Sequence, residues 1–236
     1  MTSPILIPPL PSAWPYEPRT VLPSLDVRGS VAVPGCGEGW TLESAPGLDL
    51  SGEAGILQAA FGRGGVHRLG GTVLRPYRRG GLVAKLNAAT YASPGRFRRE
   101  LAVHRALWEA GFPTVEPLGL AWRRAGLGVE GLYFTRLTDA RPWPADWSAT
   151  VTTELLKALK ALSAWGLFAP DLNATNVLWG DAGLVLLDWD RAAWRGGALL
   201  RRYQARLQRS LAKLGAPDGL RAALDQGFAS MGSSRS

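Results

Sequence analysis

Three polar side chains in one stretch of the sequence have the types and spacing needed for chemistry on a phosphate. Asp171 and Asn176 lie five positions apart in a segment rich in turn-forming residues, and Asp188 follows two short apolar runs. A carboxylate can accept the proton of an attacking hydroxyl, while amide and carboxylate oxygens are ligands that suit Mg²⁺. Taken singly, each residue is typical of a loop cap or a strand end. Together they indicate phosphoryl transfer.

The spacing also resembles the D-x-x-x-x-N catalytic loop of protein kinases and the D-F-G segment that follows it. This resemblance implies that Asp171 is the catalytic base, that Asn176 and Asp188 hold Mg²⁺, and that ATP is the phosphoryl donor. We expect strands at 177–179 and 184–190, joined by a tight turn, and this hairpin would bring the two metal ligands together.

A glycine-rich turn upstream is a candidate site for the phosphates of the nucleotide. It comprises Gly62, Gly64 and Gly65 between two expected strands, and backbone N–H groups of such a turn can approach phosphate oxygens. Glu100 lies in an expected helix at 96–110, where a kinase carries the glutamate that pairs with its phosphate-binding cation. A solvated Glu bonded to a nearby arginine explains the local sequence about as well.

The identity of that cation stays open between two residues. Arg75 lies on the strand that follows the glycine turn and its hairpin, which is the expected order of elements. Lys85, in Val83-Ala84-Lys85, has the residue type that kinases use but follows an additional turn. We prefer Arg75, and both remain candidates for binding the nucleotide.

The elements that must position these residues follow from periodicity and turn signals. Ser93-Pro94 is typical of a helix start, and Gly70-Gly71 is typical of a two-residue hairpin turn. Strands are expected at 55–61, 66–69, 72–77, 118–122 and 131–137, and helices at about 94–110, 149–164, 198–214 and 217–229.

This order predicts an α+β protein of two lobes, as in the protein-kinase fold, with a cleft between them. A small, mostly β N-terminal lobe with one helix would bind the nucleotide over residues 31–137. A mostly helical catalytic lobe would follow at 138–236. The proline-rich residues 1–30 are expected to be extended or poorly ordered.

Composition excludes several other classes of site and suggests an anionic partner. The chain of 236 residues has one cysteine, Cys36, and two histidines, His67 and His104, so we expect no internal disulfide and no zinc site. It has no apolar run long enough to span a membrane and no secretory signal, so we expect it in the cytoplasm. The net charge of +8 favours a partner such as a nucleotide, a phospholipid or a phosphorylated glycolipid.

Several longer segments resemble the bacterial 3-deoxy-D-manno-octulosonic acid (Kdo) kinases over roughly residues 55–215. They are LRPYRRGGLVAKL (74–86), FRRELAVHRALWEAGFPTVEPLG (97–119), DLNATNVL (171–178), LLDWDRA (186–192) and LLRRYQARLQRSLAKL (199–214). The resemblance implies transfer of the ATP γ-phosphate to a hydroxyl of Kdo on a lipid A precursor, at the cytoplasmic face of the inner membrane.

Two positions depart from the pattern of that family. Ala169 replaces the histidine that usually lies two residues before the catalytic aspartate, and D-W-D replaces D-F-D at Trp189. We expect weaker ordering of the loop from the first change and little effect from the second. Asn173 replaces the lysine that kinases of serine and threonine place there, which favours a small-molecule or glycan acceptor.

Two other classes of function remain open from the sequence. One is a kinase of another small molecule or glycan, and the other is a non-catalytic, pseudokinase-like binding protein. We expect no nucleic-acid partner, because no reading motif is present. We expect a peripheral membrane protein, because basic residues crowd one helix, whose apolar stripe is expected to pack into the second lobe. The stripe is Leu200, Tyr203, Leu207, Leu211 and Leu214, and the basic residues are Arg201, Arg202, Arg206, Arg209 and Lys213.

Overall fold

The structure, a computed structural model, describes residues 5–50, 54–57, 66–78, 90–143 and 148–233. These residues form two compact units, and each is described by itself. The first, which we call the sheet unit, consists chiefly of Thr20–Arg105 and Val115–Thr138. The second, which we call the helical unit, comprises Leu6–Arg19, Ala106–Thr114 and Asp139–Ser236.

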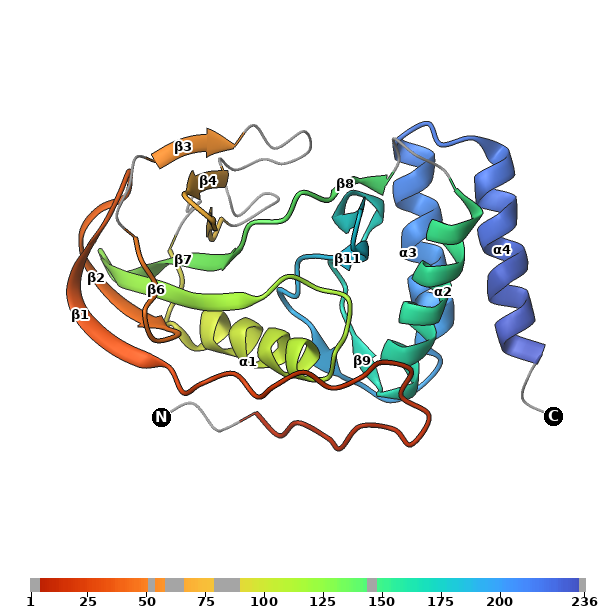
Figure 1. The fold of residues 1–236 in the computed structure, drawn as a ribbon, viewed down its shortest axis with the longest axis horizontal. Coiled ribbons are helices and arrows are strands. Elements are labelled where there is room, and N and C mark those ends of the chain that lie inside the picture. The colour runs from red at the N-terminus through yellow and green to blue at the C-terminus, as the bar shows by residue number, and fades with distance from the viewer. Residues whose placement is uncertain (1–4, 51–53, 58–65, 79–89, 144–147, 234–236) are drawn as a thin grey trace. The chain divides into compact units, whose positions relative to one another are not determined.

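The sheet unit is built on seven antiparallel strands in the order β1-β2-β6-β7-β5-β4-β3 (Figure 1). The strands are β1 (Asp26–Val33), β2 (Gly37–Ser44), β3 (Ala54–Leu57), β4 (Val66–Leu69), β5 (Thr72–Pro76), β6 (Pro117–Ala125) and β7 (Gly128–Arg136). The helix α1 (Gly95–Glu109) leads from β5 towards β6. Strand β5 lies inside the sheet, with Arg75 opposite Tyr133 of β7.

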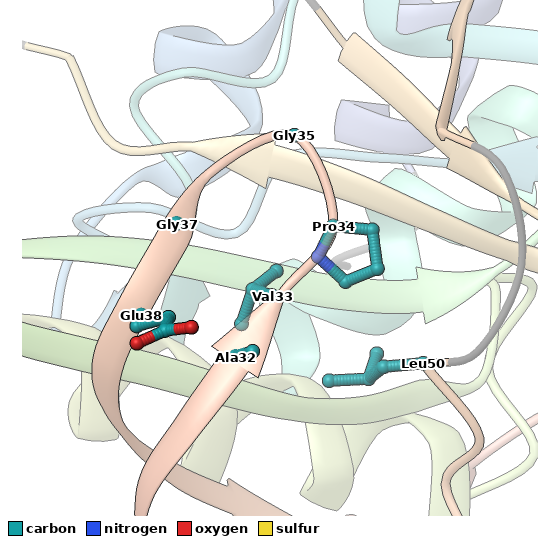
Figure 2. A pocket seen from close by; sticks show the side chains of 7 residues that line it. All are labelled: Ala32, Val33, Pro34, Gly35, Gly37, Glu38 and Leu50. Atoms are coloured by element: carbon teal, nitrogen blue, oxygen red, sulfur yellow. The ribbon is translucent and has the colours of Figure 1, made fainter.

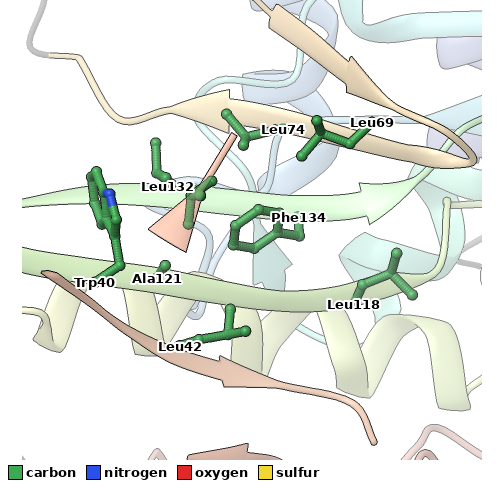
Figure 3. Close-up of a cluster of buried hydrophobic side chains, with 9 residues drawn as sticks. Trp40, Leu42, Leu69, Leu74, Leu118, Ala121, Leu132 and Phe134 are labelled. Carbon is green, nitrogen blue, oxygen red and sulfur yellow. The ribbon is translucent and has the colours of Figure 1, made fainter. Parts of the chain in front are cut away.

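The two faces of the sheet pack against different partners, because successive residues of a strand point to opposite sides. Leu74 lies in a cluster of buried side chains on one face (Figure 3). Its other members are Val33, Trp40, Leu42, Leu69, Leu118, Ala121, Leu132 and Phe134. Tyr77 and Tyr133 lie on the opposite face, where they pack with Phe97 and Leu101 of α1. The strand β5 therefore directs its odd-numbered side chains towards α1.

Over the residues described, the helical unit contains three α-helices that contact one another and two small sheets. The helices are α2 (Ala149–Ala164), α3 (Leu199–Lys213) and α4 (Asp218–Ser233). A hairpin of β10 (Val177–Gly180) and β11 (Gly183–Leu186) pairs with β8 (Arg141–Pro142), and β9 (Leu167–Phe168) pairs with β12 (Ala193–Trp194). A short 3₁₀ helix, η3 (Ala174–Asn176), precedes β10. The side chain of Ser148 caps α2 by accepting a hydrogen bond from the N–H of Val151.

An N-terminal segment, residues 6–19, packs onto the helical unit without forming a helix or strand. The indole of Trp14 donates to the carbonyl of Ala110 at 2.6 Å, and Arg19 donates to carbonyls of Trp108 and Phe112 at 3.0 Å. Gly111 ends α1 with a positive φ, and a Cβ there would clash with the backbone of Glu17. These contacts hold the segment in place.

The structure differs from the expected strands in several places. Strands β1 and β2 were not expected, and the boundary at residue 31 falls inside β1. Strand β1 lies at the edge of the sheet, and most of its side chains are exposed. Strand β11 ends at Leu186, before Asp188, whereas the strand expected at 55–61 is described only at its start, as β3.

The other expected elements are present to within a few residues. The α2 helix covers the expected range, and the hairpin of β4 and β5 turns at Gly70-Gly71. The chain is therefore a mixed α/β protein whose N-terminal part is rich in antiparallel sheet. None of its four helices, over the residues described, has the length and apolar character needed to cross a membrane.

Candidate active site

The hairpin of β10 and β11 brings Asn176 and Asp188 together, as its sequence predicts. Antiparallel pairing places Val177 opposite Leu186, and the N–H of Leu187 donates to the carbonyl of Asn176 at 3.0 Å. The amide nitrogen of Asn176 then lies 3.5 Å from a carboxylate oxygen of Asp188. The same amide nitrogen donates to the backbone carbonyl of Asp171 at 2.9 Å. Asn176 therefore connects the other two predicted site residues.

The backbone at Asp188 is held in a conformation that side chains other than glycine rarely adopt. Its φ is +68°, in the left-handed region. The next residue, Trp189, is fully buried, and its indole donates to the hydroxyl of Thr114 at 2.9 Å. That hydroxyl donates in turn to the carbonyl of Leu186 at 2.9 Å. The two bonds fix the chain on either side of Asp188 and so maintain the unusual backbone.

The loop that carries Asp171 is fixed by α3 and by its own side chains. The hydroxyl of Tyr203 donates to the carbonyl of Leu167 at 2.8 Å and accepts from the N–H of Ala169 at 3.1 Å. Burial raises the pKa of Tyr203, so the hydroxyl keeps its proton. Asn173 donates to the carbonyl of Asp171 at 2.8 Å. Ala169 is thus held through its backbone.

Two arginines face the carboxylate of Asp171. Arg191 forms a fork with both oxygens, with its Nε 2.7 Å from one oxygen and its terminal nitrogen bonded to the other. A terminal nitrogen of Arg206, on α3, lies 3.6 Å from the same carboxylate. Neither arginine was expected at this site. Arg206 was assigned to the basic surface of α3, and the structure turns it towards Asp171 instead.

Asn176 and Asp188 have the donor set that Mg²⁺ accepts. Mg²⁺ is bound in phosphoryl-transfer sites by one or two carboxylates, with phosphate and water oxygens as its other ligands. One amide oxygen and one carboxylate meet that need, and the two side chains are adjacent. Among the residues described, no group of three His, Cys, Asp or Glu side chains could hold a metal ion. The two residues fit a Mg²⁺ ion that is shared with a nucleotide.

A second group of predicted residues lies in the sheet unit. Arg75 of β5 forms an ion pair with Glu100 of α1 at 2.5 Å, and the hydroxyl of Tyr77 donates to the other oxygen of Glu100 at 2.6 Å. The Glu100 side chain is 1% exposed, whereas Arg75 keeps 33% of its side chain in solvent. The guanidinium also lies over the ring of Tyr77 at 5.2 Å. The buried carboxylate thus holds a cation whose outer part is accessible.

Tyr77 and His104 keep this second group in defined protonation states. Burial, followed by the neighbouring Glu100 carboxylate, raises the pKa of Tyr77, so its hydroxyl stays a donor. Burial lowers the pKa of His104 to about 3, so the ring is neutral near pH 7. Its Nδ1 lies 2.9 Å from the hydroxyl of Tyr133. The positive charge nearest Glu100 in this arrangement is that of Arg75.

The remaining predicted residues are those of the glycine turn and the alternative cation. Gly62, Gly64, Gly65 and Lys85 lie outside the residues that the structure describes. The choice between Arg75 and Lys85 as the phosphate-binding cation therefore stays a prediction. The pairing of Arg75 with Glu100 is the observation that supports Arg75.

The chain is similar over most of its length to proteins named 3-deoxy-D-manno-octulosonic acid kinase. One from Xanthomonas oryzae pv. oryzae (strain PXO99A) is 32% identical over 196 residues, which are 75% of this chain and 73% of that protein. One from Xylella fastidiosa (strain 9a5c) is 32% identical over 175 residues, which are 69% of this chain and 67% of that protein. One from Xanthomonas campestris pv. campestris (strain B100) is 33% identical over 174 residues, which are 65% of this chain and 68% of that protein.

The chain belongs to the 3-deoxy-D-manno-octulosonic acid kinase family. No family model matches it, so the assignment depends on these similarities, which cover 65–75% of the chain. The predictions of this family and of a phosphotransferase are confirmed.

Sequence reasoning missed three residues that contact the predicted ones, namely Tyr77, Arg191 and Arg206. A signal for Tyr77 was present, since residues two apart on a strand share a face and Arg75 was already a candidate. Arg191 lies close to Asp188 in the sequence, but nothing there indicates a bond with Asp171. For Arg206 the sequence holds no signal, because only the packing of α3 brings it to the loop.

A hollow of the sheet unit is lined by none of the predicted residues that the structure describes. Figure 2 shows it beside the turn from β1 to β2. Val33, Pro34 and Leu50 line it, and Glu38 is the charged residue among the described residues of its lining. Its volume is about 530 Å³. The lining offers one carboxylate and no cation to a phosphate, so we assign it no part in phosphoryl transfer.

Proposed function

We propose that this kinase transfers the γ-phosphate of ATP to a hydroxyl of Kdo on a lipid A precursor, in the biosynthesis of the lipopolysaccharide core. The observation that carries the proposal is the grouping of Asp171, Asn176 and Asp188 through the amide of Asn176. The names of the relatives supply the acceptor sugar. A two-lobed, kinase-like fold is part of the same proposal.

Asp171 acts as the general base in this reaction. Its carboxylate accepts the proton of the acceptor hydroxyl as that oxygen forms a bond to the γ-phosphorus, and the bond from the γ-phosphorus to the bridging oxygen breaks to release ADP. The hydrogen bonds of Asn173 and Asn176 to the Asp171 carbonyl orient the loop for this step. Orientation of this kind is the main protein contribution to phosphoryl transfer, along with electrostatic stabilisation.

Each predicted group, taken by itself, has residues suited to binding part of a nucleotide. Asn176 and Asp188 would hold Mg²⁺, which neutralises charge on the phosphate oxygens when bound. Arg75, kept in place by Glu100 and Tyr77, presents its partly exposed guanidinium to the phosphates. The glycine turn with Gly62, Gly64 and Gly65, and Lys85 as the alternative cation, remain part of the proposed nucleotide site.

The acceptor also places the protein at the cytoplasmic face of the inner membrane as a peripheral protein. Tyr203, Leu207 and Leu211 of α3 are buried, so the predicted apolar stripe packs inside the helical unit. Four of the predicted basic residues stay exposed on the same helix: Arg201, Arg202, Arg209 and Lys213. Each basic group close to an anionic leaflet contributes about 1 kcal/mol, enough in combination for reversible attachment.

ADP release with and without a Kdo–lipid A precursor tests the catalytic proposal. We expect release that depends on the acceptor and requires Mg²⁺ or Mn²⁺, and Asp188→Asn should weaken both metal-dependent ATP binding and turnover. Asp181, an exposed residue of the β10–β11 turn, gives the matched control as Asp181→Asn. Acceptor-independent ADP release, or normal Mg-ATP binding and turnover in Asp188→Asn, would contradict the proposal.

Sedimentation with liposomes tests the membrane proposal separately. Binding to anionic liposomes at low salt should disappear as ionic strength rises, because the Debye length falls to about 8 Å near physiological salt. Replacing Arg201, Arg202 and Arg209 with Gln should abolish sedimentation while sparing activity on a soluble, deacylated acceptor. Arg206 is left unchanged because it faces Asp171. Salt-insensitive binding, or none, would count against peripheral attachment.

A further inference from the structure

The proposed base, Asp171, does not have a free carboxylate in this structure. Arg191 occupies both of its oxygens with a two-point fork, one bond through Nε at 2.7 Å and the other through a terminal nitrogen. The Asp171 side chain is 19% exposed and the Arg191 side chain is 56% exposed. An ion pair this accessible contributes little to stability and can exchange partners with a competing carboxylate.

The backbone at Arg191 has an unusual conformation for this residue. Its φ is +60°, in the left-handed region that glycine or asparagine adopts at lower cost. The arginine side chain is therefore placed beside Asp171 from a backbone that does not favour it. Left-handed backbone at residues other than glycine gathers at ligand-binding and catalytic sites, where surrounding structure maintains it.

Arg206 adds a second guanidinium whose bonding is incomplete. Its terminal nitrogen is 3.6 Å from Asp171, beyond hydrogen-bond distance, and its Nε is buried with no hydrogen-bond partner among the residues described. The two arginines and the one carboxylate are together net positive. The group therefore has donors and charge for a second anion.

We propose that Arg191, assisted by Arg206, is the receptor for the carboxylate of the acidic acceptor sugar. The planar fork of arginine matches a carboxylate in two-point geometry, and Arg191 already uses that geometry with Asp171. When the acceptor carboxylate replaces Asp171 as the ion-pair partner of Arg191, the oxygens of Asp171 can accept the proton of the acceptor hydroxyl. Binding of an acid and availability of the base are then coupled.

This inference rests on the proposed function and goes beyond it by naming the group of the acceptor that is recognised. It also predicts a specificity rule. A neutral acceptor has no carboxylate to displace Asp171. Arg191 then stays bonded to Asp171, and phosphoryl transfer is slow. An acidic acceptor both binds and releases the base.

The test uses a soluble, deacylated Kdo acceptor and the same acceptor with its carboxylate reduced to an alcohol. Wild-type protein should prefer the acid in kcat/KM. Arg191→Gln should lower kcat/KM for the acid by about tenfold or more, the usual effect of losing a hydrogen bond to a charged group. The same variant should turn over the reduced acceptor as fast as wild type or faster, because its Asp171 is no longer held.

Arg191→Lys and Arg206→Gln should each keep part of the preference for the acid, because the first retains both positive charges without the planar guanidinium of Arg191 and the second retains the charge of Arg191. Arg195→Gln, an exposed arginine of the helical unit that has no proposed role, is the matched control and should keep the full preference. A loss of kcat/KM that is equal for both acceptors in Arg191→Gln would overturn the inference, since a merely structural arginine acts in that way. Failure of wild-type protein to phosphorylate either acceptor would overturn the proposed function, and the inference with it.

Discussion

Two ion pairs between an arginine and a carboxylate differ sharply in their surroundings. In the sheet unit, Glu100 is 1% exposed and its two oxygens accept from Arg75 and Tyr77. In the helical unit, Asp171 is 19% exposed and its principal partner, Arg191, is 56% exposed. The bonds are of the same chemical kind, but the first pair has lost most of its water and the second has not.

The difference shows which pair is fixed and which can open. Separating Glu100 from Arg75 would leave a buried carboxylate with one donor, which is costly in an apolar environment. Separating Asp171 from Arg191 exposes both groups to water, at low cost. A buried pair suits a nucleotide-binding cation that must keep one position. An accessible pair suits a base that must be released during the reaction.

The largest effect is expected from removing the proposed base. Asp171→Ala should reduce phosphoryl transfer by about two to four orders of magnitude, the usual contribution of a general base, while ATP binding and folding stay nearly intact. Single-turnover rates at saturating ATP measure the first effect, and nucleotide titration measures the second. Wild-type turnover in the purified variant would show that Asp171 is not the general base.

Breaking the buried pair should have the next largest effect, on stability. Glu100→Ala should lower the free energy of unfolding by about 3 kcal/mol, because broken buried pairs cost about 3–5 kcal/mol and Arg75 is partly exposed. Urea denaturation measures this cost. Glu116→Ala, which breaks the exposed pair with Arg136, is the matched control and should cost less than about 1 kcal/mol. Equal losses of unfolding free energy in the two variants would show that burial does not make the Arg75–Glu100 pair more stabilising than the exposed pair.

The roles of Arg75 and Glu100 in nucleotide binding can be measured as a coupling. Each single change to Ala should raise the KM for ATP, and the double variant should be little worse than either one. A coupling energy of about 0.5–3 kcal/mol is typical of residues in contact. If Arg75→Ala leaves the KM unchanged while Lys85→Ala raises it, the phosphate-binding cation is Lys85.

The pH dependence of stability tests the environment of His104, beside the buried pair. Burial, assisted by the charge of Arg75 and opposed by a hydrogen bond with the Val115 backbone, lowers its pKa from 6.5 to about 3. Between these values the unfolded chain binds one more proton than the folded chain. The stabilisation is therefore complete above pH 6.5 and is lost as the pH falls towards 3, by about 1.4 kcal/mol for each pH unit.

His104→Gln should flatten that dependence between about pH 4 and pH 6, because Gln does not titrate. Urea midpoints collected at several pH values for the wild type and the variant give the two slopes. Parallel slopes would mean that His104 takes up no extra proton on unfolding.

The smallest effect is expected from removing the accessible pair. Arg191→Gln should change the free energy of unfolding by less than about 1 kcal/mol, since the side chain is mostly exposed and its charge is screened by solvent. The same denaturation experiment measures it. A loss as large as that of Glu100→Ala would show that the pair is structural and cannot exchange partners.

The sequence by itself determined the chemical class and much of the local structure. The motif segments identified the family and a phosphotransferase, which the relatives confirm. Periodicity placed α2 at Ala149–Ala164 and the β4–β5 hairpin at Gly70-Gly71. These features depend on residues that are only a few positions apart, so they can be predicted from local sequence. The roles of Asp171, Asn176 and Asp188 remain predictions, although the structure brings the three residues together.

Only the tertiary structure decided the strands β1 and β2 and the surroundings of the catalytic loop. Strand β1 forms because it pairs with β2 at the edge of the sheet, where most of its side chains are exposed. Arg206 reaches Asp171 because Tyr203 and other buried residues of α3 fix the rotation of that helix. Pairing between charges far apart in sequence depends on such packing, and neither composition nor spacing encodes it.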